Sequence, residues 1–89
     1  MPERVVTVVP EDGLHARPAS KFVETANEFD AEVQVGHIDD NPVNAASMLA
    51  VTGLAVTCGD DVQVRAEGPD ADAALDELTR ILSTPEEDL

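Results

Sequence analysis

The sequence predicts an α+β fold in which two longer helices and one short helix cover one face of a four-stranded antiparallel sheet. Four segments have the composition or the alternation of β-strands. Two other segments repeat apolar residues every three or four positions, as amphipathic helices do. The predicted strands are Arg4 to Val9, Ala31 to Gly36, Val43 to Asn44 and Asp61 to Glu67.

The predicted strands differ in how much of each should be buried. Residues Arg4 to Val9 alternate only in part, which favours a central strand. Val33 and Val35 alternate with polar residues, as in a half-buried strand. The two residues after Pro42 can form only a short return strand, because proline removes one donor from the ladder.

Turn and cap residues define the last helix. Gly68 and Pro69 end the fourth strand, and Asp70 is predicted to cap the helix that follows. Asp72 in its first turn and Arg80 in its last both suit the helix dipole. Its apolar stripe is formed by Ala71, Ala74, Leu75, Leu78, Ile81 and Leu82.

Length and composition predict one domain over residues 1–89. The 89 residues are 43% hydrophobic, which suits a single modest core, and residues 83–89 are expected to form a frayed tail. No apolar stretch is long enough to insert in a membrane, and the N-terminus lacks a signal-peptide core, so we expect a cytoplasmic protein. The single cysteine, Cys58, cannot form an internal disulfide.

The net charge of −14 argues against a nucleic-acid partner, and the only aromatic residues, Phe22 and Phe29, provide no surface for stacking bases. Apolar periodicity persists throughout, so the acidic residues should cover a folded domain. One lysine, Lys21, against nineteen acidic residues resembles the composition of halophilic archaeal proteins. Molar salt would screen this charge, because the Debye length falls to about 3 Å. A mesophilic acidic protein is the alternative.

Residues 13–19, Gly-Leu-His-Ala-Arg-Pro-Ala, combine a turn, a helix start and two chemically active side chains. Gly13 can supply the positive φ of a tight turn, and Pro18 suits the first turn of a helix. Apolar residues then recur at helical spacing. We therefore predict that His15 lies at, or just before, the first turn of this helix.

A helix start of this kind is suited to phosphate. Unpaired N–H groups and the positive end of the helix dipole favour an anion, and Arg17 adds a guanidinium that matches phosphate oxygens. The imidazole of His15 can attack phosphorus and later release the phosphoryl group, with no metal required. The alternative is that His15 is only a polar residue at a helix start and Arg17 a solvated charge.

The same residues resemble the signature Gly-Ile/Leu-His-Ala-Arg-Pro-Ala of HPr, the histidine-containing phosphocarrier family of the phosphoenolpyruvate-dependent sugar phosphotransferase system. Residues Val43 to Val51 resemble the second conserved segment of that family, which opens a short helix. The resemblance extends from Arg4 to Leu82. It implies the open-faced sandwich of HPr.

The resemblance also implies the chemistry. His15 would accept a phosphoryl group on Nδ1 from phosphorylated enzyme I and pass it to enzyme IIA domains, for uptake of a sugar or of dihydroxyacetone. Arg17 and the backbone N–H groups of Ala16 and Arg17 would contact the phosphoryl group. The protein would be a monomeric carrier rather than an enzyme, and it would need no cofactor, with phosphoenolpyruvate as the upstream phosphate source.

The second segment contains a possible regulatory serine and a docking surface. Ser47 matches a serine that a kinase phosphorylates in the Gram-positive branch of the family, although capping of the short helix is the interpretation we favour. Met48, Leu49 and Thr52 would share in docking enzyme I and the enzyme IIA domains.

Other residues allow weaker hypotheses. His37, Asp39 and Asp40 could suggest a metal site, but a solvated turn is favoured and no metal is expected. Asp12 would repel an incoming phosphate unless it points away or caps the helix. Two other functions remain: a binding module that is never phosphorylated, and a small hydrolase, which would need a shielded water.

Overall fold

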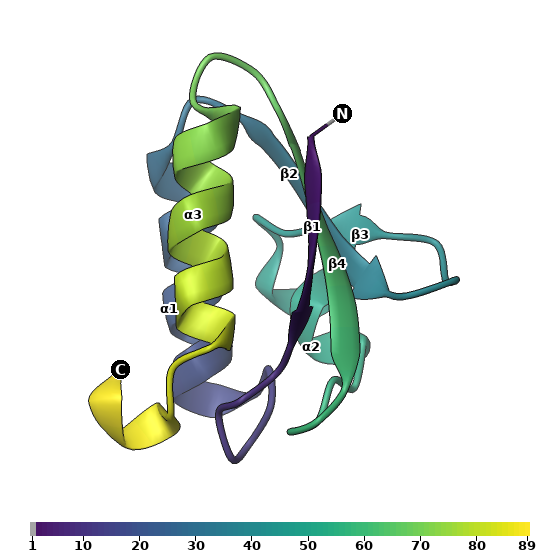
Figure 1. Ribbon diagram of the computed structural model, residues 1–89, viewed down its shortest axis with the longest axis vertical. Coiled ribbons are helices and arrows are strands. Elements are labelled where there is room, and N and C mark those ends of the chain that lie inside the picture. The colour runs from purple at the N-terminus through teal and green to yellow at the C-terminus, as the bar shows by residue number, and fades with distance from the viewer. Residues whose placement is uncertain (1) are drawn as a thin grey trace.

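One antiparallel sheet carries the helices on one of its faces (Figure 1). The computed structural model describes residues 2–89, apart from the side chain of Ala16. Across the sheet the strand order is β1-β4-β2-β3, with β1 Glu3–Thr7, β4 Asp61–Glu67, β2 Glu32–His37 and β3 Val43–Asn44. The helices are α1 Ala16–Glu28, α2 Met48–Gly53 and α3 Ala71–Leu82, followed by a 3-10 turn, η1, Glu86–Asp88. This is the predicted α+β architecture.

The core lies between the sheet and the pair of long helices, which run side by side in Figure 1. Val35 of β2 and Val64 of β4 pair in the ladder and are fully buried. Phe22 of α1 and Leu78 of α3 fill the space above them and are also fully buried. The apolar stripe predicted for α3 is confirmed, since all six of its residues are buried.

The first strand departs from its prediction as a central strand. It pairs only with β4 and is therefore an edge strand, in which Val5 is 59% exposed. Val8 and Val9, which made the segment look continuous, lie beyond the ladder. Val8 is buried in the core, and the N–H of Val9 donates to the carbonyl of Leu82 at 2.8 Å. The partial alternation thus reflects a strand followed by a core-anchored loop.

Asp70 stands at the N-cap position of α3, but its side chain does not cap the helix as predicted. Its Oδ2 accepts instead from the N–H of Asp30, 2.8 Å away, in the connection between α1 and β2. The N–H of Asp70 donates in turn to the carbonyl of Asp30 at 3.1 Å. This reciprocal pair joins two loops, and a carboxylate used in this way is no longer available to the helix.

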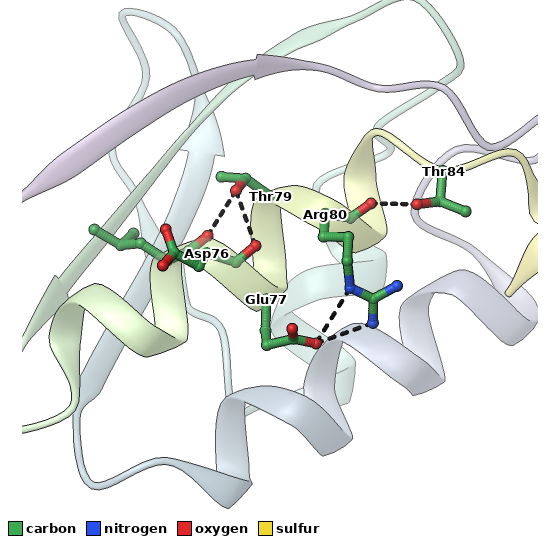
Figure 2. Close-up of polar contacts among 6 residues, drawn as sticks. Asp76, Glu77, Thr79, Arg80 and Thr84 are labelled. Carbon is green, nitrogen blue, oxygen red and sulfur yellow. Dashed lines mark hydrogen bonds and ion pairs between the residues drawn. The ribbon is translucent and has the colours of Figure 1, made fainter.

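The C-terminal residues, which we expected to fray, form the 3-10 turn η1 after α3. Hydroxyls tie the end of α3 to the residues that follow: Thr84 Oγ1 donates to the carbonyl of Arg80 at 2.5 Å (Figure 2). Thr79 Oγ1 also donates within α3, to the carbonyl of Leu75 at 2.7 Å. Leu89 then packs against the core, which sets η1 beside the loop before α1. A contact between the last residue and the core is not visible in local sequence.

The surface carries most of the acidic residues, and its ion pairs are exposed. Within residues 2–89 the three pairs are Arg4 with Asp76, Arg65 with Glu3, and Arg80 with Glu77 (the last is drawn in Figure 2). Exposed pairs of this kind contribute little to stability. The net charge of −14 is therefore opposed mainly by ions in the solvent.

We predict that the folded state loses stability as salt is removed, because repulsion among the surface carboxylates grows as the Debye length increases. The melting temperature should fall by about 5 °C or more between molar and low-millimolar potassium chloride. Thermal melts followed by circular dichroism would measure this. A variant with Asp39→Asn and Asp40→Asn should depend less on salt. An unchanged melting temperature for the wild type would contradict the prediction.

Candidate functional site

The loop before α1 is held in place by a glycine that no other residue could replace without strain. Gly13 has φ of +63°, and a Cβ built there would lie 2.1 Å from the carbonyl oxygen of Val56. Leu14, the next residue, donates its N–H to the same carbonyl at 3.2 Å and is fully buried. The predicted glycine turn is confirmed. Gly13 also allows the loop to pass close to the backbone of Val56, after α2, and this second role was not predicted.

His15 occupies the N-cap position of α1, as predicted. Its backbone is extended, with φ −133° and ψ 162°, and its carbonyl accepts from the N–H of Ala19 at 3.5 Å. The half-buried imidazole makes no capping hydrogen bond to the helix. Its nitrogens are therefore not committed to capping the helix that follows.

The first turn of α1 begins directly after His15. The first N–H groups of a helix have no partner in the preceding turn. Pro18 has no N–H, and the N–H of Ala19 donates to the carbonyl of His15, so the N–H of Arg17 is a donor that helix geometry leaves without a partner inside the helix. No acidic residue lies in this turn. The arrangement provides a small anion site at the positive end of the helix dipole.

Arg17 is exposed and lines a pocket of about 430 Å³. The other residues lining the pocket are Glu11 and Asp12 from the preceding loop, and Glu86 and Glu87 from η1. Asp12 does not cap α1, since His15 holds that position. The sequence indicated Asp12 as a carboxylate near the site, but the approach of Glu86 and Glu87 to Arg17 was missed. Only the glutamates near the C-terminus and the apolar Leu89 could have suggested it.

The carboxyl of Glu86 is perturbed by this setting. Its pKa is raised above the ordinary 4.5, first by a hydrogen bond with the Asp12 carboxyl, then by partial desolvation and by the negative charges of Asp12 and Glu11. Arg17 acts in the opposite direction, because its positive charge favours the ionised form. The pocket therefore brings together a guanidinium and carboxyls that repel one another.

Ser47 caps α2, as the favoured interpretation held: its Oγ accepts from the N–H of Ala50 at 3.2 Å. Met48 and Leu49 follow and are 41% and 85% exposed. Thr52 is half-buried, and its hydroxyl donates to the carbonyls of both. Met48 and Leu49 thus form an exposed apolar pair, while the hydroxyl of Thr52 is occupied within the helix. The helix itself packs against α1.

His37 is not part of a solvated turn, in contrast to the interpretation favoured from the sequence. It ends β2, is half-buried, and its Nε2 lies 2.8 Å from the carbonyl oxygen of Leu54 at the end of α2. Asp39 and Asp40 remain exposed in the turn. Across the described part of the chain, no three His, Cys, Asp or Glu side chains gather as metal ligands would.

The fold and the helix start together define a small carrier of phosphoryl groups. The family model for the "PTS HPr component phosphorylation site" matches residues 2–84. The phosphocarrier protein HPr of Haloferax volcanii is 72% identical over 94% of this chain and 96% of its own length. That of Streptomyces coelicolor is 43% identical over 100% of this chain and 96% of its own.

Solved structures agree with the sequence relatives. HPr from Thermoanaerobacter tengcongensis has a TM-score of 0.87 at 36% identity, covering 93% of this chain and 92% of that protein. HPr from Bacillus anthracis gives the same TM-score and identity over 91% of this chain and 95% of its own. The chain belongs to the HPr family of the phosphotransferase system. It is a phosphocarrier, not a catalytic enzyme.

Within residues 2–89, no helix is both long and apolar enough to cross a bilayer.

We predict that Gly13→Ala destabilises the protein by about 2 kcal/mol or more, because the new Cβ combines a positive φ with a clash against Val56. Gly59→Ala is the matched control: Gly59 has φ of +93°, but no atom lies within 4 Å of the position of its Cβ. Urea unfolding of both variants would compare them. Equal losses would show that the contact with Val56 adds nothing.

Replacing Ser47 with Ala should cost about 1 kcal/mol of unfolding free energy, because the N–H of Ala50 loses its capping acceptor. Ser20→Ala, on the exposed side of α1, provides the control and should change stability much less. Chemical denaturation measures both. A Ser47→Ala variant as stable as the wild type would contradict the capping role.

Proposed function

We propose that His15 accepts a phosphoryl group from phosphorylated enzyme I and passes it to enzyme IIA domains. The observation that carries this proposal is the position of His15: its imidazole makes no capping hydrogen bond, and it stands at the N-cap of α1, two residues before Arg17. In the forward step the lone pair of Nδ1 attacks phosphorus. The new N–P bond forms as the bond between phosphorus and the donor breaks, and the donor keeps that electron pair.

Arg17 and the N–H groups of Ala16 and Arg17 would bind the phosphoryl oxygens. Phosphoryl transfer requires positioning and charge stabilisation more than covalent machinery, and these donors supply both without a metal or another cofactor. The exposed side chain of Arg17 is free to reach an incoming group. Phosphoenolpyruvate would enter only as the upstream donor, through enzyme I.

Partners would dock on the surface formed by the start of α1 and by α2. Met48 and Leu49 supply exposed apolar area, and Thr52 holds the turn that presents them. The Gly13 contact with Val56 ties this helix to the loop that carries His15. The capping bond supports a structural rather than regulatory role for Ser47, since phosphorylation would replace the capping hydroxyl.

The composition and the sequence relatives support a proposal for the cellular setting, namely the salt concentration and the compartment. A net charge of −14 and a relative in Haloferax volcanii support a protein that works in the cytoplasm at high salt. The carrier would act as a monomer and serve uptake of a sugar or of dihydroxyacetone, a choice that belongs to its enzyme II partners.

We predict that His15→Ala abolishes labelling from phosphoenolpyruvate and enzyme I, because no acceptor nitrogen remains. Arg17→Ala should slow transfer by about one to two decades, the effect of losing a charged hydrogen bond worth roughly 1.5–3 kcal/mol at the transition state. Arg17→Lys should recover only part, because it keeps the charge and loses the planar fork. Rates of phosphoryl uptake and donation in molar salt, with intact mass as the readout, measure all three.

Arg80→Ala is the control for loss of an arginine, because Arg80 lies on α3 and pairs with Glu77. It should transfer at the wild-type rate. Wild-type rates in Arg17→Ala would rule out a role for Arg17 in transfer. Label that persists in His15→Ala, or a wild-type adduct stable in acid, would refute the assignment of His15.

A further inference from the structure

The loop that leads into His15 rests on the turn after α2, residues 54–56. Leu14 donates its N–H to the carbonyl of Val56 at 3.2 Å. Gly13 passes the same carbonyl so closely that a Cβ would lie 2.1 Å from its oxygen. The place of His15 therefore depends on the geometry of this turn.

Ala55, in the middle of the turn, has a backbone conformation that is unfavourable for alanine. Its φ is +53°, in the left-handed region, where the Cβ crowds the backbone. A residue in such a conformation keeps it only when the surrounding structure holds it there. On the following side, the carbonyl of Val56 is held by Leu14. The question is what holds the preceding side.

The peptide unit between Leu54 and Ala55 is held at both of its ends. The N–H of Ala55 donates to the carbonyl of Thr52 at 3.3 Å. The carbonyl of Leu54 accepts from Nε2 of His37, 2.8 Å away, at the end of β2. The orientation of this peptide unit sets φ of Ala55, since φ is the rotation about the bond from its N to its Cα. The imidazole of His37 thus fixes the plane whose rotation would release the strain.

His37 is suited to act as a fixed support. It is half-buried, and its backbone is part of the sheet, where it pairs with Val62 of β4. A carbonyl oxygen can only accept, so Nε2 must carry a hydrogen. That hydrogen is present both in the imidazolium and in the neutral ring with its proton on Nε2. The contact with Leu54 therefore does not require one particular charge of the ring.

Resting on the proposed function, we propose that His37 is a positioning residue for phosphoryl transfer. Its hydrogen bond to Leu54 holds the turn after α2 in the conformation that supports the loop before α1. Without that bond, the peptide unit before Ala55 can rotate toward a negative φ, which moves the support and misorients His15. His37 acts through these residues and does not itself contact the phosphoryl group.

Two substitutions separate the hydrogen bond from the mere presence of a side chain. In His37→Gln the amide nitrogen reaches about as far as Nε2 and can still donate, whereas in His37→Asn it falls short of the carbonyl of Leu54. Val33→Ala is the matched control, because Val33 is buried in the same strand. Its truncation destabilises the core about 13 Å from His37 along β2.

The test is single-turnover mixing of phosphorylated enzyme I with increasing amounts of the carrier in molar salt. It gives a maximal transfer rate and a half-saturating concentration, both per folded protein as measured by circular dichroism. For His37→Asn the maximal rate should fall about tenfold while half-saturation changes little, because a misplaced acceptor affects the chemical step. His37→Gln should recover most of the rate. Val33→Ala should transfer at the wild-type rate although it is less stable.

A second measurement requires no substitution of His37. The chain has two histidines, so His15→Ala leaves the ring of His37 as the only imidazole signal. Long-range ¹H–¹⁵N correlation of the neutral ring should show the hydrogen on Nε2. A bare Nε2 could not donate to Leu54, and it would overturn the inference even if the variants of His37 did not fold.

A wild-type maximal rate in His37→Asn would overturn the inference. Equal losses in His37→Asn and His37→Gln would also overturn it, because the shape of the ring would then matter rather than its hydrogen bond. An equally slow Val33→Ala would overturn it by tracing the effect to lost stability. In all these cases the wild type still carries phosphate. Absence of label from the wild type would instead refute the proposed function, and with it this inference.

Discussion

The site depends on the close approach between the backbone of Gly13 and that of Val56. No side chain fits at residue 13, and the buried Leu14 donates its N–H to the same carbonyl. This contact fixes where the loop ends and therefore where α1 begins, which places His15 at the N-cap. Because Val56 follows α2 closely, it also sets the distance between the histidine and the exposed pair Met48 and Leu49. One backbone contact thus joins the loop that carries His15 to the segment that follows α2.

Much of this arrangement could be predicted because it is local. The stripe of α3, the alternation of β4 and the glycine turn before α1 each depend on residues a few positions apart, where period and φ preference decide the structure. The bounds of β4 agree with their prediction to the residue, and α3 spans the predicted apolar stripe. The position of His15 at the helix start was predicted for the same reason, since proline and the apolar spacing define it within one turn.

What could not be predicted depends on contacts distant in sequence. The edge position of β1 depends on the order of the strands in the sheet, in which β1 pairs only with β4. The sequence of residues 4–9 does not indicate this order. His37 was assigned to a solvated turn because its acceptor, the carbonyl of Leu54, lies seventeen residues away. The tail was expected to fray because nothing in the local sequence indicates that Leu89 packs against the core. That last contact sets Glu86 and Glu87 beside Arg17.

The donor set at the start of α1 is small, and this suits a carrier. Pro18 removes one N–H from the first turn, and the carbonyl of His15 accepts from that of Ala19. Under the proposed function, the N–H groups of Ala16 and Arg17 and one guanidinium would serve the three oxygens of a phosphoryl group. A site with more donors, or with a metal, would bind the group more tightly and hold it longer. A carrier must instead keep the free energy of its phosphorylated state close to that of its partners, so that the group moves in either direction.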